Sequence, residues 1–371
     1  MKFVIVTNVN HVQSKSQYFG YAPYVREMNI WLKHIDKVII VGHSSDKKPT
    51  AIDIAYQHNN IDFRKVPDFN FTSFKNNLLS LLKLPTLLWQ IFFAMKEADH
   101  IHLRCPGNMG LLGCLVQILF PNKKKTAKYA GNWNSKSKQP WTYKLQKYIL
   151  GNTSLTKNMQ VLVYGEWQNQ SKNIKPFFTA TYSESEKEII DKKGFDQTIE
   201  IIFVGGLVVG KNPLYAVKLV EKLIERGYKV SLNLYGEGIE RVNLEQYIDE
   251  HKLKAYVFLK GNHNQEVIKK AYQNSHFVIL PSRSEGWPKA IAEGMFFGCV
   301  PIATKVSCVP YMLNFGNRGV LLEMNLDSDL IQIKEILENE DIFINKSKLA
   351  AEWSQNYTTD FFEVEIKKLL E

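Results

Sequence analysis

The sequence predicts an α/β fold built from two doubly wound parallel-sheet domains, and three observations support this prediction. The chain has 371 residues, which exceeds the roughly 100–200 residues of a typical domain. Hydrophobic residues make up 45% of it, enough for two buried cores. Short apolar runs alternate with helical patterns through both halves, and this alternation is typical of parallel sheets covered by helices.

The second half shows this alternation most clearly. Ile201 to Val204 is a short apolar run, and Asn212-Pro213 then combines an expected N-cap with proline at the first helical position. Apolar residues follow at helical spacing up to Gly227, where we expect the helix to end. Further strands are expected at Val230–Leu234, Tyr256–Leu259, His276–Leu280 and Val300–Ala303, with helices around Leu244–Ile248 and Val267–Ala271 and another that begins at Pro288.

The first half alternates less regularly, with strands expected at Phe3–Val6, Val38–Val41 and Ile101–Leu103. The apolar stretch Leu78–Met95 contains Lys83, Pro85 and Gln90, so we do not expect it to span a membrane. We do not expect the first residues to form a signal peptide either. The predicted domains are 1–175 and 199–355. Residues 176–198 would connect them, and the helix of 356–371 would pack back toward the first domain.

Charge is distributed unevenly along the chain. Residues 1–175 hold 24 Lys and Arg against 9 Asp and Glu, whereas the remainder holds 23 against 28. A basic half beside a slightly acidic half indicates that the first half meets an anionic partner, unless it is simply a solvated basic surface. The four cysteines form no C-x-x-C pair and have no histidine cluster nearby, so we expect reduced thiols and no zinc site.

The segment from Pro281 to Met295 carries the clearest chemical signal. It follows an apolar strand and holds two carboxylates, Glu285 and Glu293, with seven residues between them. Pro288 is expected to start a helix, which places Glu285 in the preceding loop and Glu293 on the helix. Backbone N–H groups and the helix dipole at such a junction favour an anion. A loop carboxylate can bind sugar hydroxyls, and a helical one can accept hydrogen bonds from a ribose.

A second glycine-containing segment runs from Gly205 to Pro213. Gly205 and Gly210-Lys211 have P-loop spacing, but Asn212 stands where a P-loop needs the hydroxyl that holds Mg²⁺. A nucleoside triphosphatase is therefore not expected. Asp327-Ser328-Asp329 has the D-x-D form of metal-dependent transferases, yet it precedes a helical pattern and is expected to cap that helix. We expect no metal site and no cofactor.

The Pro-Ser-x-x-Glu-Gly-Trp-Pro sequence and its two glutamates resemble the signature of glycosyltransferase family 4. The resemblance covers Ile199 to Glu323 well and the first half only in outline. It implies a GT-B fold, in which two Rossmann-like domains face a cleft, and retaining, metal-independent transfer of a sugar from a nucleotide-diphosphate sugar. It also implies catalytic roles for Glu285 and Lys211. The predicted donor-binding residues are Gly205, Gly206, Lys211, Arg283, Glu285, Gly286, Trp287, Pro288, Lys289, Glu293 and Gly236.

The chain departs from this family at Gly206. The family has an arginine there, and that arginine binds the donor diphosphate together with the lysine that Lys211 matches. The departure removes one cation from the leaving-group site. Arg283 or Lys289 can compensate, or backbone N–H groups of the glycine-containing loop can hold the phosphates instead.

The acceptor side is expected in the first half, where polar residues follow strands. The candidates are Gly20, in an expected loop after the first strand, and Arg104, Asn108 and Asn132; His102 is expected to be buried. Lysines around them, with Trp141, Tyr143 and the Leu78–Met95 stretch, favour peripheral contact with an anionic membrane, and no nucleic-acid motif is present. These lysines are Lys123, Lys124, Lys125, Lys136, Lys138, Lys144 and Lys147.

The resulting hypothesis is a retaining glycosyltransferase that acts on a glycan or lipid-linked acceptor in cell-surface or exopolysaccharide biosynthesis. It would work in the cytoplasm, at or near the inner face of the membrane. One alternative is a catalytically silent nucleotide-sugar-binding or assembly protein, which Gly206 favours. Another is a different GT-B enzyme, such as a sugar-nucleotide epimerase.

Overall fold

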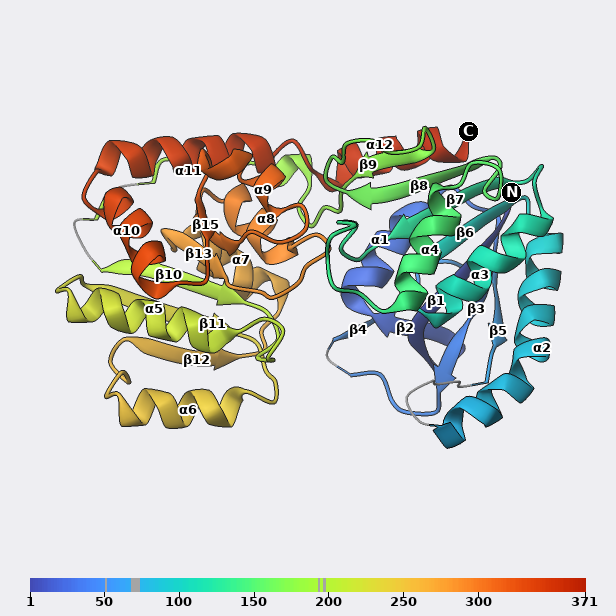
Figure 1. Ribbon diagram of the computed structural model, residues 1–371, viewed down its shortest axis with the longest axis horizontal. Coiled ribbons are helices and arrows are strands. Elements are labelled where there is room, and N and C mark those ends of the chain that lie inside the picture. Colours follow the sequence, from blue (N-terminus) through green and yellow to red (C-terminus); the bar gives the residue numbers. More distant parts are fainter. Residues whose placement is uncertain (51, 68–73, 193, 196–197) are drawn as a thin grey trace. The chain divides into compact units, whose positions relative to one another are not determined.

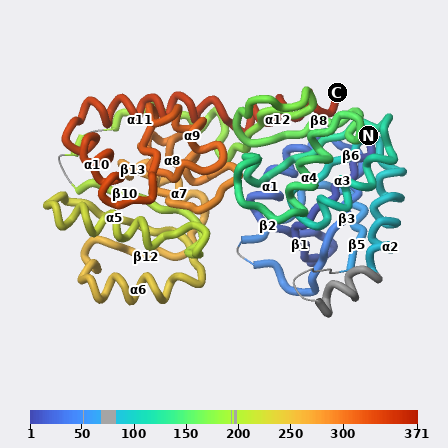
Figure 2. The backbone as a smooth tube through the Cα atoms, in the orientation of Figure 1, coloured from blue at the N-terminus to red at the C-terminus, as the bar shows by residue number. Residues whose placement is uncertain are grey.

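The computed structural model describes residues 1–50, 52–67, 74–192, 194–195 and 198–371, and the backbone alone of 74–82 (Figure 1). Part of the stretch 78–95 and three residues of the expected connection 176–198 therefore lie outside what is described. The chain divides into two compact units. Unit 1 comprises Met1–Phe178 and Phe362–Glu371, and unit 2 comprises Thr179–Phe361. Figure 2 follows the backbone from unit 1 into unit 2 and back.

Unit 1 is built on a nine-stranded sheet. Its parallel strands follow the order β5-β3-β1-β6-β7-β8-β9, so the chain order reverses between β1 and β6. The elements are β1 (Lys2–Ser14), β2 (Gln17–Tyr21), α1 (Ala22–Leu32), β3 (Lys37–Ser45), β4 (Asp53–Ala55), β5 (Ile61–Lys65), α2 (Phe74–Glu97), β6 (His100–Cys105), α3 (Asn108–Val116), η1 (Gln117–Leu119), β7 (Lys124–Tyr129), α4 (Trp141–Gly151), β8 (Met159–Tyr164) and β9 (Ile174–Phe177).

The expected loop at Gly20 is wrong. The first strand continues to Ser14 and then pairs with β2 in antiparallel register, His11 opposite Gly20. Gly20 is therefore a buried strand residue, and helix α1 begins at Ala22 immediately after the hairpin. The irregular register between Val6 and Asn10 lets one strand serve both the parallel sheet and the hairpin.

Unit 2 is built on a six-stranded, fully parallel sheet with the order β12-β11-β10-β13-β14-β15. Counted from β10, this is the 3-2-1-4-5-6 order of a doubly wound nucleotide-binding sheet, and its switch point lies between β10 and β13. The elements are η2 (Glu184–Glu186), β10 (Ile199–Val204), α5 (Pro213–Glu225), β11 (Val230–Tyr235), α6 (Arg241–Glu250), β12 (Val257–Gly261), α7 (Gln265–Gln273), β13 (Phe277–Leu280), α8 (Lys289–Phe296), β14 (Val300–Thr304), α9 (Val309–Met312), η3 (Asn314–Gly316), β15 (Val320–Leu322), α10 (Leu326–Leu337) and α11 (Glu340–Ser354).

Local sequence accounts for most of these boundaries. Helix α5 starts at Pro213, and Gly227 follows its end with a φ of 86°. Asn264 caps α7 by accepting a hydrogen bond from the Val267 backbone. Asn212 occupies the N-cap position of α5, as expected, but it has left-handed backbone angles and its side chain makes no capping bond. The cap of α10 is Asn325, not the Asp-x-Asp sequence that follows it.

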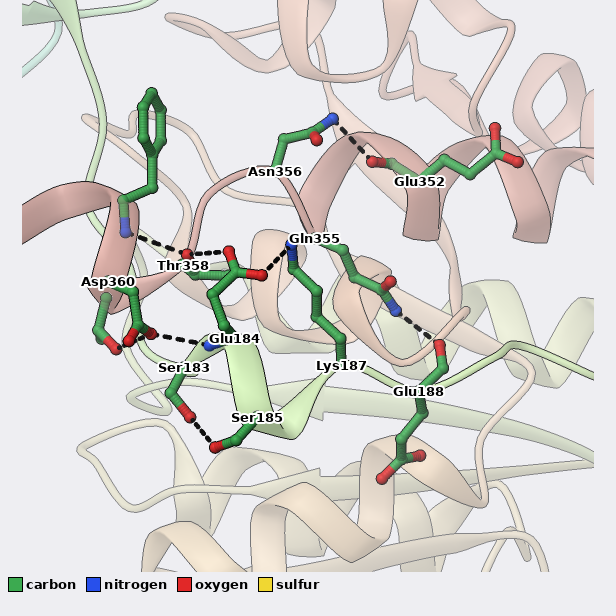
Figure 3. A network of polar contacts seen from close by, with 12 residues as sticks. Ser183, Glu184, Ser185, Lys187, Glu188, Glu352, Gln355, Asn356, Thr358 and Asp360 are labelled. Carbon is green, nitrogen blue, oxygen red and sulfur yellow. Dashed lines mark hydrogen bonds and ion pairs between the residues drawn. The ribbon is translucent and has the colours of Figure 1, made fainter. Parts of the chain in front are cut away.

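Residues 183–188, near the start of unit 2, are hydrogen-bonded to residues 355–360, near its end (Figure 3). Glu184 accepts a hydrogen bond from the Thr358 hydroxyl at 2.7 Å and pairs with Lys187. Its backbone N–H donates to Asp360 at 2.8 Å. The final helix, α12 (Thr359–Leu370), begins here, and its Phe362 ring packs on Phe177 at the end of β9 within unit 1.

No helix among the described residues combines the length and apolar character needed to cross a membrane. The stretch 78–95 belongs to α2, which contains Pro85.

The close packing of α8 on β13 gives a first prediction. A Cβ atom at Gly294 would lie 2.6 Å from a methyl carbon of Val278. Gly294→Ala should therefore lower the free energy of unfolding by roughly 1–3 kcal/mol, as overpacking does. Urea denaturation followed by circular dichroism measures the change.

The matched control is Gly151→Ala at the end of α4, where the nearest atom to a new Cβ is 3.9 Å away. It should be neutral or stabilise by up to about 1 kcal/mol. Adding Val278→Ala to Gly294→Ala should recover part of the loss. Equal effects of the two glycine substitutions would show that this packing is looser than described.

Candidate functional site

The switch point of unit 2 brings a lysine and a carboxylate together. Lys211 follows strand β10, and Glu285 follows the adjacent strand β13. The Lys211 Nζ lies 2.6 Å from the Glu285 Oε1, while the two side chains are 32% and 8% exposed, respectively. The sequence separates these residues widely, and the parallel sheet joins them at its carboxyl edge, where ligands of such sheets bind.

The glycine-containing loop after β10 is held by its neighbours through the backbone. The Gly205 N–H donates to the Tyr235 carbonyl, and the Leu207 N–H donates to the Glu237 carbonyl. A Cβ at Gly236 would lie 1.9 Å from the Gly205 carbonyl oxygen, so only glycine permits this approach. Gly236 therefore shapes the loop that carries Gly205 and Gly206.

The loop after β13 is fixed to the first loop and to the segment after β14. The Arg283 N–H donates to the Gly210 carbonyl at 2.9 Å. The Gly286 carbonyl accepts from the Ser307 hydroxyl and the Cys308 thiol, each at 3.1 Å. Burial raises the pKa of Cys308 to about 12, so its thiol stays protonated and keeps donating. These bonds hold the backbone on both sides of Glu285.

Trp287 and Pro288 are structural parts of the same loop. The Trp287 ring is buried and stacks on Trp353 of α11, with a centroid separation of 6.0 Å, and it meets Tyr357 edge-on. Pro288 occupies the N-cap position of α8, as expected. The aromatic packing fixes where α8 begins, and hence where the backbone N–H groups at its start point.

Glu293 is on α8 but makes its hydrogen bonds away from the Lys211–Glu285 pair. Its carboxylate accepts from the Thr181 hydroxyl at 2.8 Å and from the Tyr272 hydroxyl at 3.3 Å. Burial raises the pKa of Tyr272 well above its ordinary value, so this hydroxyl remains a donor. Glu293 and Lys289 both line a hollow of about 10 Å³ in unit 2, the size of roughly one water molecule.

The other predicted donor residues lie close to the pair in sequence but differ in exposure. Arg283 is exposed, and Lys289 is half-buried at the start of α8. Gly206 has free space, because the nearest atom to a Cβ at this position would be 3.8 Å away.

Sequence reasoning missed Thr181, Tyr272 and Cys308, which orient the site through hydrogen bonds. Their types and spacing carry no motif that could have revealed them.

Arg104, an acceptor candidate, belongs to a buried charge cluster in unit 1. Its guanidinium lies 3.4 Å from the Glu27 carboxylate and over the Tyr24 ring. Glu27 also lies 3.9 Å from the Lys128 ammonium, which donates to the Phe178 carbonyl at 2.6 Å. Arg104 therefore has a structural role in this cluster, whether or not it also meets an acceptor.

The remaining acceptor candidates lie at the carboxyl edge of the unit 1 sheet. Asn108 is the first residue of α3, directly after β6. Asn132 is buried beyond β7, and its side-chain oxygen accepts from the Asn134 N–H at 2.9 Å, as in an Asx turn. His102 is buried, as expected, and burial lowers its pKa to about 3.

The expected lysine surface is only partly correct. Lys125 is buried and donates to the carbonyls of Gln117 and Phe120, and burial lowers its pKa to about 8. Lys123 donates to two carbonyls near the end of α2, and Lys147 donates to the Asn134 carbonyl. These three lysines cap backbone groups.

All four cysteines are free and buried.

No group of histidine, cysteine, aspartate or glutamate side chains suited to a metal ion occurs among the described residues. In the Asp-x-Asp sequence, the second carboxylate is engaged in hydrogen bonds within the fold. Asp329 is buried and accepts hydrogen bonds from the Glu323 N–H and the Tyr215 hydroxyl. It therefore anchors α10 to the sheet.

Comparison with known proteins places this geometry in context. Residues 185–359, which lie within unit 2, match the family model described as Glycosyl transferases group 1. An uncharacterised glycosyltransferase of Methanocaldococcus jannaschii is 26% identical over 203 residues, which cover 54% of this chain and 55% of that protein. The chain thus spans about half the length of this relative.

Solved structures show the fold over the whole chain. Anabaena HepE in complex with UDP has a TM-score of 0.72 at 13% identity, with 100% of this chain and 99% of that chain covered. WaaG, a glycosyltransferase involved in lipopolysaccharide biosynthesis, has a TM-score of 0.65 at 11% identity, with 100% and 98% covered. The chain has the GT-B fold, with two parallel-sheet units.

The ion pair at the switch point yields a stability prediction. Lys211→Ala leaves the buried Glu285 carboxylate without its cation and should lower the free energy of unfolding by about 1–3 kcal/mol. Lys211→Ala combined with Glu285→Gln should cost less than the sum of the single changes, because the neutral amide needs no cation. A double-mutant cycle by urea denaturation measures this coupling.

Lys229→Ala is the control, since Lys229 is an exposed lysine of the same unit. Its effect should stay within about 0.5 kcal/mol. Strict additivity of the Lys211 and Glu285 changes would mean that the pair does not form in solution.

Proposed function

We propose that this chain is a retaining glycosyltransferase of the family 4 type that moves a sugar from a nucleotide-diphosphate sugar to a glycan or lipid-linked acceptor. One observation carries the proposal: Lys211 and Glu285 meet at the switch point of a doubly wound sheet. A cation and a carboxylate at this place suit the two ends of a sugar diphosphate, because one attracts phosphate and the other accepts from hydroxyls.

Each residue then has a distinct role toward the donor. Lys211 has three N–H donors, so it can keep its bond to Glu285 while it binds a phosphate oxygen. Glu285 retains acceptor positions for hydroxyls of the transferred sugar. Backbone N–H groups of the Gly205 loop and of the start of α8 complete the anion site. Glu293 is assigned to the ribose, since its carboxylate can accept further hydrogen bonds beside those from Thr181 and Tyr272.

The proposed reaction uses neither a protein nucleophile nor a metal. The bond between the anomeric carbon and the diphosphate oxygen breaks, and the acceptor hydroxyl forms its new bond on the same face. The acceptor proton passes to the departing diphosphate oxygen. Negative charge grows on the diphosphate during this step, and a fixed ammonium at Lys211 stabilises it in the transition state.

The comparisons support the substrate class and the setting of this proposal. The HepE structure was determined with UDP, a nucleoside diphosphate, and WaaG takes part in lipopolysaccharide biosynthesis. We extend these properties to this chain as a role in cell-surface polysaccharide biosynthesis, in the cytoplasm and near the membrane. Arg104, Asn108 and Asn132 are the proposed acceptor contacts in unit 1.

Gly206 favours a second candidate, a nucleotide-sugar-binding protein without catalytic activity. The residue leaves the leaving-group site with one cation fewer than the family pattern has. Arg283 is exposed in the loop that carries Glu285 and is the candidate for the missing charge. Turnover with a panel of uridine, guanosine and adenosine diphosphate sugars separates an enzyme from a silent binder, and product analysis without acceptor identifies an epimerase.

Neutralising Glu285 tests the catalytic assignment. Glu285→Gln should reduce sugar transfer to membrane extracts by roughly 10²–10³-fold, the usual loss when a charged group that acts in the transition state is removed. Transfer of radiolabelled sugar measures it. Glu352→Gln, a change at an exposed carboxylate of the same unit, should leave the rate unchanged. Full activity of Glu285→Gln would remove Glu285 from the mechanism.

Restoring the missing cation tests the role of position 206. Because space surrounds Gly206, Gly206→Arg should fold normally and tighten donor binding about tenfold through a charge-assisted contact with the diphosphate. Calorimetric titration with the nucleotide sugar measures this affinity. Weaker binding by Gly206→Arg would indicate that the donor phosphates do not pass this loop.

A further inference from the structure

Unit 1 carries an exposed apolar groove between α2 and the α3–η1 segment. The groove encloses about 620 Å³, and the described residues that line it are all apolar, including Leu88, Trp89, Phe92, Phe93, Leu115 and Leu119. Trp89 is 67% exposed and Leu119 is 65% exposed. Contiguous apolar surface of this kind marks an interaction site, whereas scattered exposed side chains need no explanation.

A lysine-lined hollow includes residues that follow those of the groove in the sequence, from Pro121 onward. It encloses about 840 Å³ at the amino ends of β7, β8 and β9, and Lys124, Lys157, Lys172, Lys175 and Lys368 line it. Among the described residues of its lining, Glu371 is the single acidic one, and Lys124 contacts the Glu371 backbone carbonyl. Within the described part of the chain, the ammonium groups of Lys157, Lys172 and Lys175 have no ion pair. The hollow is therefore strongly cationic.

Residues 120–123 connect the groove to the hollow. The Phe120 ring packs on Phe92 of α2 with a centroid separation of 5.2 Å. The Lys123 ammonium lies 5.7 Å from the centre of the Phe120 ring and donates to the carbonyls of Lys96 and Ala98. Apolar and basic surfaces thus adjoin through a well-anchored turn. We call this combined surface, made of the groove and the hollow, the docking edge.

We propose that the docking edge binds the surface of an anionic lipid bilayer. Trp89 and Leu119 would enter the interfacial region, and the lysines of the hollow would meet lipid phosphates. The aromatic and aliphatic groove suits the apolar acyl-chain boundary of a bilayer, and the neighbouring cluster of lysines suits its anionic headgroups. The inference rests on the proposed function, because a membrane-bound enzyme would meet a lipid-linked acceptor.

The docking edge differs from the acceptor residues. It contains Lys124, Lys125 and residues 88–93 of the surface expected to meet a membrane, but not Trp141. It lies at the amino ends of the parallel strands, whereas Arg104 and Asn132 lie at the carboxyl ends. Trp141, on α4, is 72% exposed and so provides a matched aromatic residue elsewhere on unit 1. Comparison of the two tryptophans therefore tests which surface meets lipid.

Co-sedimentation of the full chain with vesicles tests the proposal. The probes are vesicles of phosphatidylcholine and vesicles in which phosphatidylglycerol replaces part of it. The chain should bind the second kind preferentially. Each lysine neutralised should weaken binding about fivefold, so Lys157→Gln/Lys172→Gln/Lys175→Gln should weaken it roughly 100-fold. Trp89→Ser/Leu119→Ser should also weaken it at least about tenfold, whereas Trp141→Ser should not.

Four results of the vesicle assay would overturn the proposal. These are no binding to either vesicle, equal binding to both, wild-type binding by both multiple variants, and loss of binding by Trp141→Ser alone. If Trp89→Ser/Leu119→Ser instead converts a dimer to a monomer, the groove joins two copies of the chain and the proposal is also wrong. All variants change exposed side chains, and circular dichroism checks their folding.

Nucleotide-sugar binding, titrated without vesicles, separates this inference from the proposed function. The docking variants should bind donor as the wild type does. Loss of vesicle binding with intact donor binding concerns the docking edge alone. Vesicle binding by a chain that binds no nucleotide sugar would instead refute the proposed function and leave the bilayer contact standing.

Discussion

The contact between the Lys211 ammonium and the Glu285 carboxylate joins the two loops that form the candidate site of unit 2. The pair exists because β10 and β13 are neighbours at the point where the strand order reverses, so the loops that follow them leave the sheet together. The first loop is fixed by backbone hydrogen bonds to the segment around the end of β11. The second is fixed after β14 by hydrogen bonds that the Ser307 hydroxyl and the Cys308 thiol donate to the Gly286 carbonyl. The carboxylate keeps the ammonium in place, and a cation held in place stabilises developing charge without first having to reorganise.

Much of this site could be predicted from sequence because its signals are local. Pro288 marks the start of α8, and the glutamate that precedes the Gly-Trp-Pro turn lies in the loop after β13, as expected. The partners of Glu293 could not be predicted in the same way. Thr181 and Tyr272 reach it from distant segments, and a hydroxyl that donates to a carboxylate leaves no periodic pattern. The two doubly wound sheets follow from the alternation of elements, and the GT-B fold is what the family resemblance implies. Side-chain partners depend on tertiary packing.

Unit 1 was harder to predict for physical reasons that particular residues illustrate. Its first strand runs past the parallel sheet into a hairpin, so Gly20 is buried where a loop was expected. Lysines near β7 look like surface charge in the sequence, yet Lys125 caps buried carbonyls and Lys128 lies among aromatic rings. Sequence counts charges but does not show which of them face solvent. The structure adds Lys157, Lys172 and Lys175, at the docking edge, to the exposed lysines that were expected.

A crystal structure of the chain soaked with a nucleotide-diphosphate sugar tests whether the donor diphosphate binds at the Lys211–Glu285 pair, as proposed. We expect diphosphate density within hydrogen-bonding distance of the Lys211 ammonium and of the Gly205 loop, with the sugar beside Glu285. Density for the diphosphate at any other place, with the Lys211 ammonium still bound to Glu285 alone, would contradict the proposal.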